Sequence, residues 1–176
     1  MIRPLRADDA GELAALLVEN RAFLAPFEPE REERFYTVEG QLERLEREDK
    51  HAFAILDGER VAGTVALSNV VRGPHESANL GYWVAERLNG RGLATKAVGE
   101  LLPIAFGELG LHRLEAGTLV DNLASRRVLE KNGFEEIGIA RGYLHIGGEW
   151  RDHMLFQLLA DRGAIPRQIV SNSSSA

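Results

Sequence analysis

Leucines recur at helical spacing near the start of the chain, at Leu13, Leu16 and Leu17, and predict an amphipathic helix. The residues before them, 2–5, favour a short strand. A thinner apolar stripe over residues 38–48 indicates a second helix. The chain therefore begins with a strand followed by two helices.

The next segment changes to the pattern of strands. Residues 51–56 and 60–70 are rich in apolar and β-branched side chains, and the turn pair Asp57-Gly58 lies between them. This arrangement predicts a β-hairpin, and an Asp-Gly pair favours a type I′ turn.

Strands and helices alternate in the second half of the chain. Residues 80–85 predict a buried strand, and a helix follows from about Leu93. Residues 112–120 predict another strand and residues 122–131 another helix. This order of elements indicates a mixed α/β sheet.

Two long apolar stretches, residues 134–146 and 149–159, close the pattern as a second hairpin around a glycine pair. We expect one domain over residues 1–160, of the α/β (α+β) class. The remaining residues, 161–176, are poor in apolar side chains and predict a partly disordered tail.

Composition narrows the functional classes. The chain has 176 residues, 44% hydrophobic and 27% charged, a net charge of −6 and no cysteine. The acidic balance argues against general nucleic-acid binding, and no apolar run is long enough for a membrane span. The lack of cysteine excludes disulfides and a cysteine acyl-enzyme and fits a cytoplasmic protein. The five histidines show no metal-ligand spacing, so we expect no metal.

The stretch that carries the chemistry is "LGYWVAERLNGRGLATKAV", residues 80–98. A strand is joined to a helix by a turn containing Gly90, Arg91 and Gly92, with Lys96 one turn into the helix. Free N–H groups at a helix N-terminus attract phosphate, and glycine lets the ligand approach the backbone. A tight strand–helix turn without a ligand explains the glycines equally well. The spacing fits neither a P-loop nor a dinucleotide fingerprint.

Residues 89–94, "NGRGLA", resemble the acetyl-CoA-binding motif Q/R-x-x-G-x-G/A of the GCN5-related N-acetyltransferases (GNAT). The first position departs from the motif, because Asn89 replaces Gln or Arg. The resemblance extends to residues 2–10, 121–134 and 142–155, and these last two segments look most like the RimJ/RimL branch, with RimJ closer. It implies the GNAT fold: about seven strands in a sheet with a V-shaped splay, flanked by about four helices.

The resemblance also implies which residues hold acetyl-CoA as co-substrate. In this family the strand ending near Ala85 parts from its neighbour, and the pantetheine arm fills the slot. The Val84 N–H would face the thioester carbonyl. Asn122 would contact the cofactor, although a plain helix N-cap accounts for it equally well. The expected cofactor-binding set is Trp83, Val84, Arg91, Gly92, Leu93, Ala94, Thr95, Lys96 and Asn122.

The expected catalytic residue is Ser125, one helical turn before Leu129. Many relatives have, at the position of Leu129, a tyrosine that protonates the departing thiolate, and RimL-like proteins are thought to use the serine instead. The base is harder to assign, since Asn79 and Leu144 occupy the positions where relatives have glutamate. Four other residues stay open as the base, namely Glu76, Glu115, His75 and His145.

The leading interpretation is direct acetyl transfer from acetyl-CoA to a primary amine, with the N-terminal α-amine of a peptide or protein favoured as acceptor. An α-amine is neutral near pH 7 far more often than a lysine, which suits a site without an evident base. The alternatives are acetylation of a small amine (an antibiotic, polyamine or amino acid) and a non-catalytic acetyl-CoA sensor. A homodimer is compatible with each of these readings.

Overall fold

The structure is a computed structural model that describes residues 1–47 and 51–160. The predicted tail, 161–176, lies outside the described residues. The strands are β1 Ile2–Pro4, β2 Ala52–Asp57, β3 Arg60–Val71, β4 Ser77–Val84, β5 Arg113–Leu119, β6 Glu135–Ile146 and β7 Glu149–Leu159. The α-helices are α1 Ala10–Leu24, α2 Val38–Arg47, α3 Leu93–Pro103 and α4 Leu123–Lys131.

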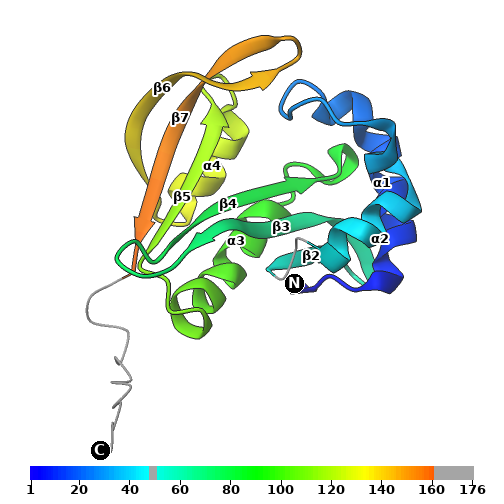
Figure 1. Cartoon of the computed structure of the whole chain (residues 1–176), viewed down its shortest axis with the longest axis horizontal. Coiled ribbons are helices and arrows are strands. Elements are labelled where there is room, and N and C mark those ends of the chain that lie inside the picture. Colours follow the sequence, from blue (N-terminus) through cyan, green and yellow to red (C-terminus); the bar gives the residue numbers. More distant parts are fainter. Residues whose placement is uncertain (48–50, 161–176) are drawn as a thin grey trace, which may run out of the picture.

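The seven strands form one mixed sheet in the order β1-β2-β3-β4-β5-β7-β6 (Figure 1). Only β4 and β5 pair in parallel, while every other neighbouring pair is antiparallel. The parallel step is possible because α3 carries the chain across between the two strands. The seven-stranded mixed sheet and the four α-helices of the described residues confirm the predicted fold.

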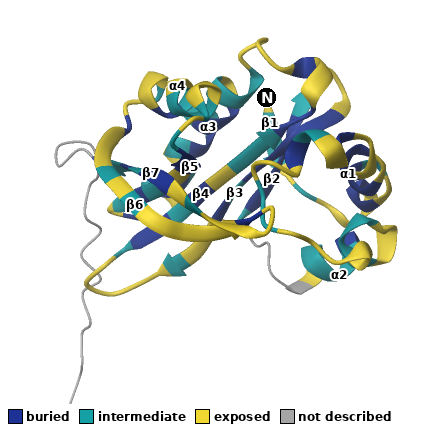
Figure 2. Cartoon of the chain, turned by 90° about the horizontal axis from the view of Figure 1, so that it is seen from above, coloured by how far each residue is buried: buried dark blue, intermediate teal, exposed yellow. Residues whose placement is uncertain are grey.

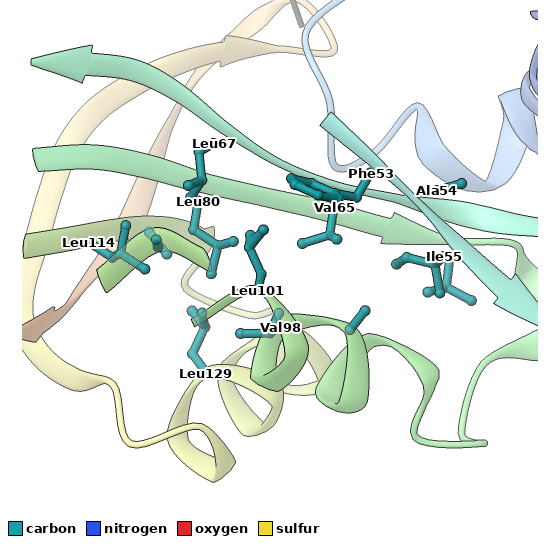
Figure 3. Packing of buried hydrophobic residues seen from close by; sticks show 14 of the residues in the cluster. Phe53, Ala54, Ile55, Val65, Leu67, Leu80, Val98, Leu101, Leu114 and Leu129 are labelled. Atoms are coloured by element: carbon teal, nitrogen blue, oxygen red, sulfur yellow. The ribbon is translucent and has the colours of Figure 1, made fainter. Parts of the chain in front are cut away.

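One face of the sheet carries the main hydrophobic core. Buried side chains from β2 to β5, such as Val65 and Leu80, pack against Val98 and Leu101 of α3 and Leu129 of α4 (Figure 3). The helices α1 and α2 lie together, apart from α3 and α4 (Figure 2). A smaller apolar cluster forms there around three leucines of α1, Leu13, Leu17 and Leu24.

The first hairpin corrects one detail of the prediction. Asp57 is the last paired residue of β2, and the two-residue loop is Gly58-Glu59. Gly58 has φ +65°, and Glu59 is not among the residues with positive φ. A type I′ turn requires positive φ at both loop residues, whereas a type II′ turn requires it only at the first. The loop is therefore not a type I′ turn, since only its glycine adopts positive φ.

The feature that shapes the molecule is the short contact between β4 and β5. The two strands pair only over Ser77–Asn79 and Arg113–Glu115. Beyond this point β4 continues for five more residues, to Val84, without a partner on that side. The splay opens at the carboxyl end of β4, where the chain turns into α3. The predicted V-shaped slot is therefore present.

No helix among the described residues is both long enough and apolar enough to cross a membrane.

Candidate active site

The splay between β4 and β5 opens into a cavity of about 560 Å³. Its walls come from the ends of β4 and β5, the first turns of α3 and α4, the end of α1 with the loop after it, and the β6–β7 hairpin. The lining includes Phe27, Glu28, Tyr82, Trp83, Val84, Asn89, Gly90, Gly92, Leu93, Ala94, Thr95, Gly117, Asn122, Ser125, Arg127, Lys131, Leu144 and His153. Most of the residues expected from the sequence thus surround one cavity.

The glycine turn has the backbone geometry of an anion-binding helix start. Gly90 and Gly92 have φ of +76° and +77°, in the left-handed region that favours glycine. Gly92 is the N-cap of α3, and the first helical bond runs from the Lys96 N–H to the Gly92 carbonyl at 3.0 Å. The N–H groups at the start of α3 therefore have no partner within the helix and stand at the positive end of its dipole.

The side chains of Arg91 and Lys96 are directed away from this cavity. The Arg91 guanidinium binds the carboxylate of Asp57 with two hydrogen bonds of 2.7 and 3.1 Å. Lys96 lies 3.9 Å from Glu100, and neither cation lines the cavity. A cofactor role for Arg91 and Lys96 stays a prediction. Both residues could still contact the cofactor through their backbone groups.

Two other cations do line the cavity, Arg127 and Lys131 of α4. They lie four residues apart, so they share one face of the helix. Ala124 and Val128 line the cavity from the same face at the same spacing. Sequence reasoning missed this pair, although its i, i+4 spacing on a helix capped by Asn122 is a usable signal.

Trp83 and Val84 line the slot at the end of β4. The N–H of the next residue, Ala85, donates to the Ala62 carbonyl of β3 at 2.8 Å. Successive N–H groups along a strand point to opposite sides, so the Val84 N–H points away from β3 and toward the splay. That is the direction from which the expected thioester carbonyl would approach, and the contact itself stays a prediction.

Asn122 caps α4 through its side chain, whose oxygen accepts from the Ser125 N–H at 3.1 Å. The interpretation as an N-cap is therefore correct, and it leaves the amide NH₂ group free to act as a donor toward the cavity. Asn122 and Ser125 both line the cavity, so the cap and a cofactor contact are compatible. The contact itself stays a prediction.

Ser125 has a partner that the sequence did not suggest. The Tyr82 hydroxyl of β4 lies 2.8 Å from Ser125 Oγ and 3.1 Å from the Ser125 carbonyl oxygen. Burial raises the pKa of Tyr82 to about 12, and the hydrogen bond with Ser125 opposes this shift. Tyr82 is therefore a neutral phenol at physiological pH, and its contact fixes the position of the serine hydroxyl.

The four base candidates raised from the sequence all lie away from the cavity. Glu115 accepts from Arg113 at 2.7 Å, and Glu76 accepts from Arg72 at 3.1 Å. His75 belongs to an exposed turn, and His145 packs edge-on against Trp150 on the surface of the hairpin. None of the four lines the cavity.

Two titratable residues that we did not propose as the base do line the cavity, Glu28 and His153. Burial raises the pKa of the Glu28 carboxyl, against the opposing effect of Arg31 and Arg44. His153 is buried on β7, with 4% of its surface exposed. Neither has a local sequence signal, because each reaches the cavity from an element distant in the chain.

In the part of the chain that the structure describes, no group of three or more histidine, aspartate or glutamate residues could hold a metal ion. The absence of a metal from the reaction stays a prediction.

Comparison with known proteins shows the family of the chain. A family model described as an acetyltransferase (GNAT) domain matches residues 1–135. A probable N-acetyltransferase of Bacillus subtilis (strain 168), YjcK, is 42% identical over 167 residues, which cover 90% of this chain and 92% of the relative.

Two solved structures have the same fold. The ribosomal-protein-S5-alanine acetyltransferase from Vibrio fischeri aligns with a TM-score of 0.87 and 32% identity, over 92% of this chain and 93% of that one. Mycobacterium smegmatis RimJ in complex with CoA-disulfide aligns with a TM-score of 0.81 and 32% identity, over 90% and 81%. The chain belongs to the GNAT family, in its RimJ/RimL branch, and is an acetyl-CoA-dependent N-acetyltransferase.

Proposed function

We propose that the acceptor is the N-terminal α-amine of a peptide or protein, acetylated directly from acetyl-CoA held at the start of α3. The observation that carries the proposal is the position of the cavity. It extends from the glycine turn to the loop after α1 and the β6–β7 hairpin, which both contribute to its lining. The similar structure named as a ribosomal-protein-S5-alanine acetyltransferase supports a protein acceptor.

The ionisation of amines favours the same acceptor. An α-amino group has an ordinary pKa of about 8, so about a tenth of it is neutral at pH 7. A lysine amine has an ordinary pKa of about 10.4, and its deprotonation costs about 3 kcal/mol more at the same pH. Since only the neutral amine attacks a thioester, an α-amine reacts more readily than a lysine amine near neutral pH.

Glu28 gives the cavity a group suited to a cationic acceptor. It belongs to the acid-rich stretch "PFEPEREER" and lines the cavity beside the apolar side chain of Phe27. A carboxylate in a partly buried setting interacts with an ammonium more strongly than one in bulk water. We infer that Glu28 holds the protonated acceptor on arrival.

The first prediction concerns acceptor preference. Peptides with a free, small N-terminal residue and no lysine should have a higher kcat/KM than the same peptides blocked at the N-terminus and carrying one lysine. We expect a preference of at least about tenfold, because the difference in amine pKa exceeds two units. Thiol release at pH 7.5 measures it. Faster turnover of the lysine peptides would overturn the α-amine proposal, and faster turnover of small polyamines would favour the small-amine alternative.

A second prediction concerns Glu28. Glu28→Gln keeps the shape of the side chain and removes its charge, so it should raise the KM for a peptide acceptor about three- to tenfold and leave the affinity for acetyl-CoA unchanged. The control is Glu30→Gln, which removes a charge from an exposed residue of the same loop. Equal KM values in the two variants would rule out the contact with the acceptor.

A further inference from the structure

His153 lies at the middle of the strand layer that forms one wall of the cavity. On β7 it pairs with Leu119 of β5 and Ala140 of β6. Its side chain lines the cavity, although only 4% of the residue is exposed. A buried histidine at a cavity wall, with strands on both sides, has a fixed position relative to whatever fills that cavity.

His153 lies on the opposite side of the sheet from Ser125. Its neighbour Met154 and then Phe156 belong to the core packed on α3 and α4. Successive side chains of a strand point to opposite faces, so His153 points to the other face. Ser125 projects from α4 on the helix-covered face, where it meets Tyr82. A thioester in the splay would therefore have the serine on one side and the imidazole on the other.

The hydrogen bond of the ring determines which nitrogen is free. His153 Nδ1 lies 3.1 Å from the Arg151 carbonyl oxygen. A carbonyl only accepts, so this contact places a proton on Nδ1, and in the neutral imidazole the lone pair is then on Nε2. Among the described residues, Nε2 has no hydrogen-bond partner. The free atom is thus a proton acceptor on a cavity wall.

Gly117 of β5 lies beside the ring. A Cβ at this position would lie 3.8 Å from His153 Cδ2 and 3.6 Å from Cε1 of Tyr143, whose ring packs on the imidazole at 5.4 Å between centroids. Packing between Tyr143 and the sheet therefore limits the rotation of the imidazole.

We propose that His153 is the general base of acetyl transfer, accepting a proton from the acceptor amine at Nε2. The ammonium gives its proton to Nε2, and the neutral nitrogen attacks the thioester carbonyl carbon. The C–N bond forms, the C–S bond breaks, and the thiolate is protonated to the free thiol of CoA. The ammonium loses two protons in all, one to Nε2 before the attack and one after the C–N bond forms. One of these protons is taken up by sulfur, and the other is released to water. The proposal rests on the N-acetyltransferase activity and not on the choice of an α-amine.

The ionisable groups around His153 define what else could contribute to a pH profile. Glu28 faces the cavity from the loop after α1, and Tyr82 from β4. Arg127 and Lys131 face it from α4, and Tyr143 of β6 contacts the ring. On β7 itself, Arg151 lies 3.7 Å from Asp121, and Asp152 accepts from the Gly142 N–H. Of these, Glu28 is the other group able to accept a proton from an amine near neutrality.

The test compares His153→Gln with His145→Gln, which removes an exposed histidine from the same hairpin. With the amine that the wild type acetylates fastest, kcat/KM should fall about hundredfold at pH 7 in His153→Gln and stay at the wild-type value in His145→Gln. The loss should shrink as the pH rises above the pKa of the acceptor, because the amine then arrives neutral. The affinity for acetyl-CoA should not change.

A second variant tests the same role if the glutamine of His153→Gln disturbs the packing of β7. His153→Ala leaves a space for imidazole, and added imidazole should restore at least about a tenth of the lost rate without changing the KM for acetyl-CoA. A loss that is equal at every pH and is not rescued would assign His153 a structural role. Glu28 would be the base if Glu28→Gln showed the loss of kcat/KM that shrinks with rising pH while His153→Gln kept the wild-type kcat/KM.

Discussion

Gly92→Asp should raise the dissociation constant of acetyl-CoA at least about tenfold, a loss of at least about 1.4 kcal/mol. Gly92 is the N-cap of α3 at φ +77°, and a Cβ there would meet no heavy atom within 4 Å. Space is therefore available, and the effect comes from backbone conformation and charge. A carboxylate beside the free N–H groups of the first turn would repel the pyrophosphate and compete for the same donors. Titration calorimetry at fixed ionic strength measures the change.

Two controls separate the effect of the added charge from that of the backbone conformation. Gly92→Asn has almost the shape of the aspartate without its charge, and asparagine tolerates positive φ, so it should bind acetyl-CoA more tightly than Gly92→Asp. Gly110→Asp makes the same change at another glycine with positive φ, +64°, that does not line the cavity. The affinity of Gly110→Asp for acetyl-CoA should match that of the wild type. A folded Gly92→Asp variant with wild-type affinity would mean that the turn does not bind the cofactor.

Ser125→Ala should lower kcat about ten- to hundredfold while the dissociation constant of acetyl-CoA changes by less than about threefold. The leaving thiol has an ordinary pKa of about 8.5, so its departure needs modest help, and a hydroxyl held in place supplies it. The Tyr82 hydroxyl fixes that hydroxyl at 2.8 Å. Steady-state kinetics with saturating acceptor, together with a direct binding measurement, separates the two quantities.

The structure also indicates that this substitution leaves no buried polar group without a partner. Tyr82 keeps the Ser125 carbonyl oxygen as acceptor, at 3.1 Å, so the stability of Ser125→Ala should stay close to that of the wild type. Asn122→Ala provides the contrast, because it removes the cap of α4 and should cost about 1 kcal/mol of stability. If chemistry limits the rate and Ser125→Ala still turns over at the wild-type kcat, Ser125 is only a helix residue.

Periodicity was sufficient to predict the elements and their order, because most of them bury one face. The start of α3 at Leu93 and the end of α4 at Lys131 follow from local chemistry. The left-handed Gly92 precedes Leu93, and Gly133, which has φ +82°, follows the end of α4. The turn type of the first hairpin was wrong, since strand pairing extends through Asp57 and moves the loop by one residue. The register of pairing depends on the sequences of both strands, so the dipeptide alone does not determine it.

The site was predictable where a single segment carries it and not where distant segments meet. The backbone turn of Gly90 to Gly92 is local, so its sequence predicts its shape. The partner of the Arg91 side chain is Asp57, 34 residues earlier, which no local pattern indicates. His153 reaches the cavity because β7 lies between β5 and β6, an order that only the assembled sheet reveals.

The most direct measurement is the site of acetylation on one peptide that carries both a free N-terminal alanine and an internal lysine. The peptide is incubated with acetyl-CoA and enzyme, released thiol is counted, and the modified residue is located by fragmentation mass spectrometry. We expect one acetyl group per thiol released, located on the α-amine. Acetylation of the lysine side chain, or thiol release without any acetylated peptide, would contradict it.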